Sequence, residues 1–308
     1  MKALKLQNLR KVYDNGFEAL KGIDLEVEAG DFFALLGPNG AGKSTTIGIV
    51  TSLVTKTAGK VEICGHDLDR EPDAAKRCLG LVPQEINFNQ FEKVGRIVLN
   101  QAGYYGVPRR QARRRMEEVL KKLDLWDRRD EVSRRLSGGM KRRLMIARAL
   151  VHCPRVLILD EPTAGVDIEI RYSMWEFLRR LNQEGTTIIL TTHYLEEAER
   201  LCRHVAIIDH GRIVESTSMK RLLAQLEYHR YLLELRNPPQ AIPEIPGYRI
   251  EAMEANVWAV EVPRSQGLNP LFAALNRLGL EVIDIRPTSN RLEQLFFQRV
   301  RQRAGEAA

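Results

Sequence analysis

The sequence has no apolar run long enough to cross a lipid bilayer. A membrane-spanning helix needs about 20 consecutive apolar residues, so no such span is expected in this chain. The first residues, Met1 to Gln7, include no apolar segment of signal-peptide length. These two absences together predict a chain that stays in the cytoplasm.

Cysteine is scarce, with four residues in 308, and no two of them form a C-x-x-C pair. They are Cys64, Cys78, Cys153 and Cys202. This wide spacing predicts reduced thiols and argues against a disulfide framework or a zinc site. The sequence also has no internal repeat and only one copy of the phosphate-binding loop described below.

The net charge of the chain does not identify a binding partner. The formal charge of +7 permits attraction to anionic lipid or to nucleic acid without choosing between them. The arginines at 109–110 and 113–115 share an expected helix with Glu117 and Glu118, which is typical of a solvated helix face. No specific binding of nucleic acid is therefore expected. The composition, 44% hydrophobic and 28% charged, is that of a globular protein, and its length allows two domains.

A glycine-rich loop is the first feature that carries chemistry. An apolar strand at 32–36 precedes it, and a helix is expected over 44–50. Backbone N–H groups of such a loop, together with the helix start, surround phosphate oxygens. Lys43 adds a positive charge there, and the Ser44 hydroxyl can ligate Mg²⁺. The predicted nucleotide-binding residues, which include the match to G-x-x-x-x-G-K-[ST], are Gly37, Pro38, Asn39, Gly40, Ala41, Gly42, Lys43, Ser44 and Thr45.

Two acids, Asp160 and Glu161, close a continuous apolar run at 156–159. A run without alternation is typical of a strand buried on both faces of a parallel sheet. Ligands gather at the carboxyl ends of such strands, so both acids are expected beside the phosphate loop. We predict that Asp160 is a Mg²⁺ partner and that Glu161 polarises the attacking water.

A second anion site is predicted at Ser137, Gly138 and Gly139, directly before an expected helix over 140–150. Serine is a favoured helix N-cap, and the N-terminus of a helix attracts anions. The chain already has a phosphate loop for its own nucleotide. A second phosphate-facing element therefore suggests an ATPase whose site is completed by another copy of itself.

With these elements in this order, the chain resembles the ATP-binding subunits of ABC transporters over about residues 1–220. Tyr13 resembles the aromatic residue that stacks on adenine, and Gln84 resembles the glutamine that joins the site to the transport subunit. Asp167 resembles the end of the loop that lies across the dimer interface. His193 resembles the switch histidine, which senses the γ-phosphate.

The resemblance also implies a mechanism. Leu136 to Met140 resembles the signature motif of the family, and the helix that follows is the signature helix. Two chains would form a homodimer around two ATP molecules with Mg²⁺, and Ser137 to Gly139 of each chain would contact the ATP of the other. Glu161 and His193 are then the catalytic residues. The Mg²⁺ ion is expected near Ser44, Gln84 and Asp160.

The expected fold class is α/β: a P-loop NTPase with a RecA-like parallel core sheet, an antiparallel β subdomain and a helical signature subdomain, followed by a small C-terminal α+β accessory domain. The ATPase domain is expected over 1–225, with its helical subdomain at about 85–153, and the accessory domain over 226–308. The expected core strands are 32–36, 156–160, 187–190 and 205–208, and the antiparallel sheet is expected from residues 1–30 and 60–64.

The accessory domain is expected to contain a proline-rich loop at 237–247. Its last helix is expected to begin near Asn290, and Leu292 to Phe296 resembles the common ending of exporter extensions. The other expected elements are strands near 229–235, 248–253, 256–262 and 281–285 and a helix near 268–278.

The predicted function is the ATP-hydrolysing motor of an ABC transporter, closest to ABC-2-type exporters, which drives an integral membrane permease encoded by a separate chain. The chain is expected on the cytoplasmic face of the inner (plasma) membrane. The segment after Gln84 is the expected coupling surface, with Phe88, Phe91, Tyr104 and Tyr105.

Two alternatives remain open. A soluble ABC ATPase that acts on ribosomes or DNA is disfavoured, because the chain has one ATPase core and no coiled-coil or zinc insertion. An importer ATPase subunit shares every motif, and only the coupling segment and the short tail argue against it.

Overall fold

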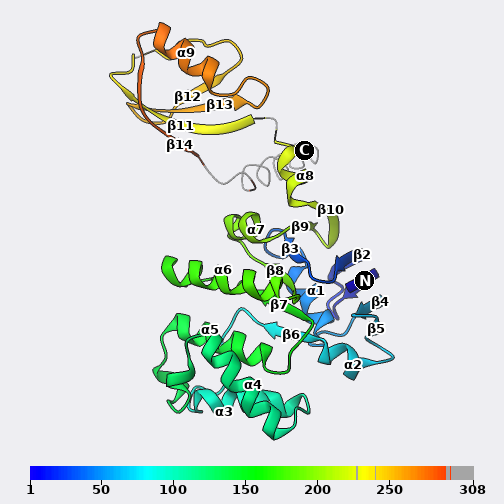
Figure 1. Ribbon diagram of the computed structural model, residues 1–308. Coiled ribbons are helices and arrows are strands. Elements are labelled where there is room, and N and C mark those ends of the chain that lie inside the picture. Colours follow the sequence, from blue (N-terminus) through cyan, green and yellow to red (C-terminus); the bar gives the residue numbers. More distant parts are fainter. Residues whose placement is uncertain (227, 240, 289–291, 293–308) are drawn as a thin grey trace. The chain divides into compact units, whose positions relative to one another are not determined.

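The computed structural model describes residues 1–226, 228–239, 241–288 and 292, and the chain divides into two compact units, Met1–Ser218 and Met219–Ala308 (Figure 1). The sequence placed the boundary after residue 225. The structure assigns helix α8 (Met219–Ala224) to the second unit, where the carbonyl of Ala224 accepts a hydrogen bond from Arg264.

A six-stranded sheet forms the centre of the first unit, in the order β10-β9-β3-β8-β7-β6. All neighbours pair in parallel except β10, which runs antiparallel to β9. Every residue of β3 and β8 is buried, which explains the apolar runs at 32–36 and 188–190. The strands are Phe32–Leu36 (β3), Leu79–Val82 (β6), Val156–Asp160 (β7), Thr187–Thr191 (β8), His204–Asp209 (β9) and Arg212–Ser218 (β10).

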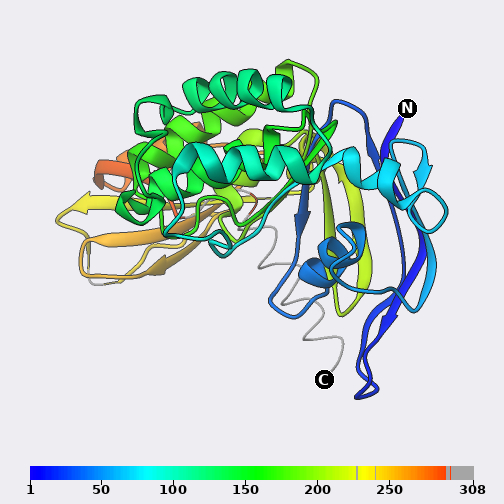
Figure 2. The ribbon, with the colours of Figure 1, turned by 90° about the horizontal axis from the view of Figure 1, so that it is seen from below.

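A four-stranded antiparallel sheet packs against this core, in the order β2-β1-β4-β5. On β2, buried Leu25 and Val27 alternate with exposed Glu26 and Glu28, because one face of the strand meets the core. Helix α1 (Lys43–Val50) lies between the two sheets and contributes buried residues to their shared core (Figure 2). The strands are Lys2–Val12 (β1), Glu18–Glu28 (β2), Ala58–Ile63 (β4) and His66–Asp67 (β5).

Helices make up most of the segment between β6 and β7, which is called the helical arm below. The helices of this arm are Val94–Tyr104 (α3), Arg109–Lys122 (α4) and Gly138–Leu150 (α5), with short 3-10 turns Trp126–Arg128 (η1) and Ser133–Arg135 (η2). Three further helices of the first unit are Pro72–Arg77 (α2), Ile168–Gln183 (α6) and Leu195–Leu201 (α7). No helix among the described residues is both long and apolar enough to span a membrane.

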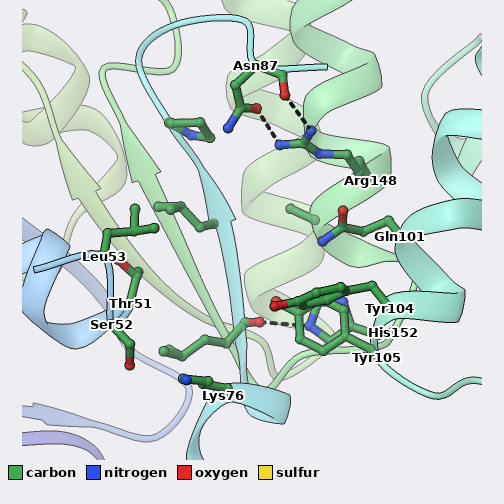
Figure 3. A pocket seen from close by; sticks show the side chains of 14 residues that line it. Thr51, Ser52, Leu53, Lys76, Asn87, Gln101, Tyr104, Tyr105, Arg148 and His152 are labelled. Carbon is green, nitrogen blue, oxygen red and sulfur yellow. Dashed lines mark hydrogen bonds between the residues drawn. The ribbon is translucent and has the colours of Figure 1, made fainter. Parts of the chain in front are cut away.

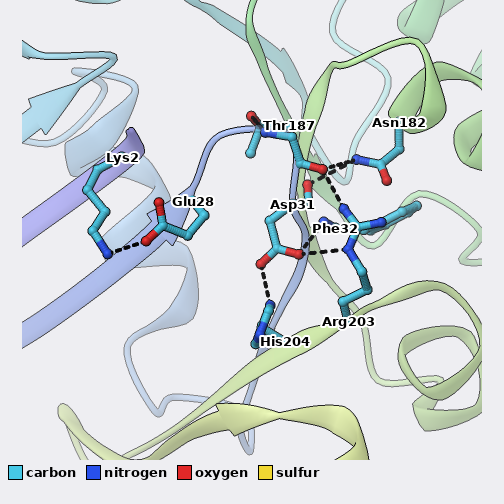
Figure 4. Close-up of polar contacts among 9 residues, drawn as sticks. Lys2, Glu28, Asp31, Phe32, Asn182, Thr187, Arg203 and His204 are labelled. Atoms are coloured by element: carbon cyan, nitrogen blue, oxygen red, sulfur yellow. Dashed lines mark hydrogen bonds and ion pairs between the residues drawn. The ribbon is translucent and has the colours of Figure 1, made fainter.

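The amino-terminal edge of the core sheet is held by a buried carboxylate, Asp31 (Figure 4). It accepts hydrogen bonds from the N–H of Phe32 (2.8 Å), Nε of Arg203 (3.3 Å) and Nδ1 of His204 (2.8 Å). The amide of Asn182 donates to its backbone carbonyl (3.1 Å). These contacts fix the start of β3, whose other end leads into the phosphate loop.

The second unit contains an antiparallel sheet in the order β12-β13-β11-β14. Trp258 and Leu233 of this sheet form a buried core together with Leu271 and Leu275 of helix α9. The elements are Tyr228–Arg236 (β11), Arg249–Ala252 (β12), Val257–Pro263 (β13), Asn269–Arg277 (α9) and Glu281–Pro287 (β14).

The predicted α/β fold is confirmed, including the parallel core sheet and the antiparallel sheet beside it. Strands β6 and β10 were absent from the prediction; β6 has only four residues, and β10 is largely polar. None of the four cysteines, all of which lie among the described residues, forms a disulfide bond in the structure. The helix expected from Asn290 and the ending at 292–296 lie outside the described residues, apart from Leu292.

Candidate functional site

A cavity of about 680 Å³ lies where the core strands reach their carboxyl ends. The phosphate loop follows β3, and Gln84 follows β6. Asp160 and Glu161 stand at the end of β7, and His193 comes just after β8. The lining residues are Phe17, Ala19, Asn39, Gly40, Gly42, Lys43, Ser44, Thr45, Gln84, Asp160, Glu161 and His193.

Close neighbours shape the phosphate loop. A Cβ at Gly37 would lie 2.2 Å from the carbonyl oxygen of Ile208, and a Cβ at Gly42 would lie 2.8 Å from Leu20 Cδ2. Gly42 also has a φ of 113°, which L side chains rarely adopt. Both positions therefore require glycine.

The ammonium group of Lys43 lies inside this loop. Its Nζ donates to the carbonyls of Gly37 (2.6 Å) and Pro38 (3.0 Å). Burial lowers the pKa of Lys43, and the negative charges of Glu161 and Asp160 oppose that effect. The cation therefore faces the two acids across the cavity.

The carboxylate of Glu161 lies at the centre of the polar contacts. Its Oε2 accepts a hydrogen bond from Nε2 of Gln84 (3.0 Å) and lies 3.2 Å from Nδ1 of His193. Its φ of 49° is unusual for a residue with a side chain and stores about 1–3 kcal/mol of strain. The N–H of Glu161 donates to the carbonyl of Thr191 (3.0 Å), and the hydroxyl of Thr191 donates to Asp160. The strained turn thus aims Glu161 at two predicted site residues.

The segment that follows Glu161 is anchored by a second buried acid, Glu197. Its Oε1 accepts hydrogen bonds from Thr163 Oγ1 (3.1 Å) and from the indole N–H of Trp175 (2.9 Å). Burial raises the pKa of Glu197, although its hydrogen bonds with Thr192, Trp175 and Thr163 act in the opposite direction. The loop from Pro162 to Asp167 is therefore tied to α7.

The residues predicted to contact a second nucleotide lie elsewhere in the chain. Ser137 caps α5, and its hydroxyl accepts a hydrogen bond from the N–H of Met140 (3.3 Å). A Cβ at Gly139 would lie 2.7 Å from Ile170, whereas Gly138 faces open space. Asp167 is exposed, just before α6. None of the predicted signature residues, nor Asp167, is among the described residues that line the cavity.

Two residues of the site escaped the sequence prediction. Phe17 lines the cavity, whereas Tyr13, predicted to stack on adenine, does not; the hydroxyl of Tyr13 lies 3.3 Å from Thr45 Oγ1. Arg142 of the signature helix is buried and contacts the carbonyl of Glu161. An exposed phenylalanine in a hairpin and one arginine in a basic run carry no distinctive sequence signal.

A second cavity, of about 280 Å³, lies between the end of α1 and the helical arm (Figure 3). The rings of Tyr105 and His152 stack on its wall, 3.7 Å apart between centroids and nearly parallel. His152 Nε2 donates to the carbonyl of Leu79 (2.7 Å), and burial lowers its pKa. Arg148 donates to the backbone and side-chain oxygens of Asn87, close after Gln84 in the chain.

Comparisons with known proteins agree with one another. The ABC transporter family model matches residues 20–164. The chain is 42% identical over 209 residues to Nod factor export ATP-binding protein I of Cupriavidus metallidurans, covering 68% of this chain and 69% of that protein. It is 34% identical over 307 residues to the daunorubicin/doxorubicin resistance ATP-binding protein DrrA of Streptomyces peucetius, covering 96% of this chain and 91% of that protein. A dimeric ATP-binding cassette bound to ADP and Pi in a post-hydrolysis state is similar in structure, with a TM-score of 0.64 and 27% identity, over 70% of this chain and 98% of that one.

Proposed function

This chain belongs to the ABC transporter family, and from that premise we propose that it is the ATPase motor of an exporter that drives a separate membrane permease. The chain is an ATPase with an ATP-binding site. One observation supports the motor proposal above all others: a single cavity collects the phosphate loop, both acids, Gln84 and His193.

Each of these groups has a part in hydrolysis. Lys43 and the N–H groups at the start of α1 bind the phosphate oxygens of ATP, because a helix N-terminus and an ammonium both attract anions. Glu161 orients the attacking water and takes its proton. Gln84 and His193 hold the Glu161 carboxylate from two sides. The roles of both residues thus depend on the same oxygen.

The residues around the cavity fit Mg²⁺. Ser44, Gln84 and Asp160 line it together and present a hydroxyl, an amide oxygen and a carboxylate, the oxygen ligands that Mg²⁺ prefers. Among the described residues no cluster of three His, Cys, Asp or Glu side chains could hold a metal ion by itself. The ion would therefore enter with the phosphates of ATP, where it neutralises their charge.

A second copy of the chain completes the site in this proposal. Ser137, Gly138 and Gly139 cap the start of α5, a position that suits an anion, yet they do not line the cavity of their own chain. Their nucleotide would be the ATP of the partner copy. The similar cassette described above is dimeric. Asp167 is exposed and available for the same interface.

We assign the permease contact to the second cavity and its rim. The cavity lies beside the segment after Gln84, and it presents the exposed ring of Tyr104 and the stacked ring of Tyr105 (Figure 3). A concave surface with aromatic residues suits a protein partner. The chain would then sit on the cytoplasmic face of the inner membrane, bound through its permease.

The relatives favour export over import. One relative is named for Nod factor export and another for daunorubicin/doxorubicin resistance. The second alignment covers 96% of this chain, so the likeness continues into the second unit. This favours the exporter proposal over the importer alternative.

The role of Glu161 is tested by Glu161→Gln, which keeps the shape of the side chain and removes its basicity. We expect ATP hydrolysis to fall by about 10²–10⁴-fold, while ATP binding measured by calorimetry persists. Lys43→Ala should lose ATP affinity instead. Glu176→Gln, on the exposed face of α6, is the matched control and should hydrolyse ATP normally. Hydrolysis at the wild-type rate in Glu161→Gln would contradict the assignment.

The transport proposal is tested with a tagged Glu161→Gln chain expressed in its native host. Membranes are extracted in mild detergent with Mg²⁺ and ATP, and the proteins that co-purify are identified. A stoichiometric integral membrane protein with about six helices would support the motor role. Ribosomes, nucleic acid or the absence of a membrane partner would overturn it in favour of the soluble ATPase. Lys43→Ala serves as the control that cannot hold ATP.

A further inference from the structure

The buried side chain of Arg142 joins three segments of the first unit. It lies on the signature helix α5 and is 6% exposed. Its Nη1 donates to the carbonyl of Pro83 (2.8 Å) and its Nη2 to the carbonyls of Gln84 (2.9 Å) and Glu161 (3.3 Å). The guanidinium group of Arg142 therefore connects the signature helix to Gln84 and Glu161, whose side chains are hydrogen-bonded to each other.

Only arginine suits this position. A guanidinium presents several N–H donors in a rigid plane, whereas a lysine ammonium is a single point on a flexible chain. Burial lowers the pKa of Arg142, and the charges of Asp160, Glu161 and Glu197 oppose that effect. The buried cation is therefore matched both by carbonyl acceptors and by nearby carboxylates.

We propose that Arg142 is the positioning residue that makes the start of the signature helix move together with Gln84 and Glu161, and that it thereby couples the two ATP sites of the dimer. This inference rests on the proposed function. Gln84 and Glu161 serve the ATP bound by the same chain, and Ser137 at the start of α5 meets the ATP of the other copy. Because thermodynamic coupling is reciprocal, ATP binding at each site then changes the ATP affinity of the other site.

The next residue on the helix supplies a matched control. Arg143 has the same chemistry, but it contacts Asp124 Oδ2 (3.0 Å) and Ser173 Oγ (3.0 Å) and not the residues of the ATP cavity. Arg143→Lys should therefore leave the coupling between ATP sites unchanged. It should reproduce any general effect of losing a guanidinium from α5.

The experiment compares Arg142→Lys with the wild-type chain and with Arg143→Lys. Arg142→Lys keeps the charge and loses the three-carbonyl contact. We expect ATP affinity at the chain's own site to stay within about threefold, while kcat falls about tenfold or more and the Hill coefficient for ATP falls to about 1. When Arg142→Lys is combined with Glu161→Gln, the affinity of ATP-dependent dimerisation should also fall about tenfold or more. A wild-type Hill coefficient and wild-type dimerisation in Arg142→Lys would overturn the inference.

Hydrogen exchange on chains with Arg142 intact provides a second test that does not depend on a variant of Arg142 folding. The Glu161→Gln chain is diluted until it is monomeric and then saturated with Mg²⁺-ATP. Amide exchange at residues 138–142 should slow on ATP binding, and unchanged exchange there would overturn the inference. Absence of ATP hydrolysis by the wild-type chain would refute the proposed function. Normal hydrolysis with unchanged coupling in Arg142→Lys would refute this inference alone.

Discussion

Replacing Gly37 with alanine tests how tightly the core sheet constrains the phosphate loop. The new Cβ would lie 2.2 Å from the carbonyl oxygen of Ile208 and 3.1 Å from its Cγ2, whereas ordinary contact begins at 3.4 Å. Ile208 belongs to β9, which pairs with β3 directly before the loop. Either the loop or the strand must therefore move by about 1 Å, a displacement that a packed interior resists.

The magnitude follows from these contacts. Overpacking of this kind costs about 1–3 kcal/mol, and a weakened hydrogen bond between β3 and β9 adds about 1 kcal/mol. In a domain of this size, a total of about 2–4 kcal/mol lowers the melting temperature by about 5–15 °C. A shift of about 1 Å in groups that position a substrate can lower the rate about 10²-fold, so ATP hydrolysis by Gly37→Ala should fall by that order.

Thermal unfolding and ATP hydrolysis are measured together for Gly37→Ala and for a control, Gly65→Ala. Gly65 also has a positive φ, of 91°, but a Cβ there meets nothing within 4 Å. The control should therefore lose only about 1 kcal/mol and keep its hydrolysis rate. If Gly37→Ala melts within about 1 °C of the control and hydrolyses ATP normally, contact with β9 does not set the loop geometry.

Three further predictions concern the cavity, the anchor of the loop after Glu161 and the amino-terminal edge of the core sheet. Phe17→Ala should weaken ATP binding in calorimetry more than Tyr13→Ala, because only Phe17 lines the cavity; the reverse order would favour the adenine role of Tyr13. The folded state of the wild-type chain holds the Glu197 proton above its ordinary pKa of 4.5, so stability falls as pH rises from 4.5 to the raised pKa. Glu197→Gln should therefore melt higher relative to wild type at pH 8 than at pH 4.5, and a constant difference between the two chains would refute this. Asp31→Ala should lower the melting temperature by about 5–15 °C, since it leaves the buried N–H of Phe32 and the side chains of Arg203 and His204 without their carboxylate. It should change kcat at 25 °C by no more than about twofold, and a larger loss of kcat would show that this edge of the sheet also serves catalysis.

The sequence predicted the fold well where local pattern and burial agree. Residues 156–159 of β7 are buried and uniformly apolar, and the prediction of a strand at 156–160 matched the bounds of β7. Strand β10 escaped because its residues are only half buried and mostly polar. The predicted boundary, after residue 225, differs from the one in the structure, after residue 218, for another reason. Contacts between residues far apart in the sequence assign α8 to the second unit, and local sequence does not encode such contacts.

The candidate site, like the fold, could be predicted from the sequence only in part. That residues of the loop at 37–45 and the acids at 160–161 lie together was predictable, because each segment follows a strand of the parallel sheet at its carboxyl end. The three carbonyl contacts of Arg142 were not, since they join residues 19 and 58–59 positions away along the chain. Phe17 was missed because a hairpin side chain reaches the cavity only through the packing of the two sheets.

The buried indole of Trp175 makes the first unit suited to optical measurement without an added label. The chain has three tryptophans; Trp258 lies in the second unit, and Trp126 lies in the helical arm. With both of these changed to phenylalanine, emission would come from Trp175 alone. Its N–H shares the carboxylate of Glu197 with Thr163, two residues after Glu161. A rearrangement of that loop would change the polarity around the ring, so the colour of the emitted light would follow the enzymatic cycle in real time.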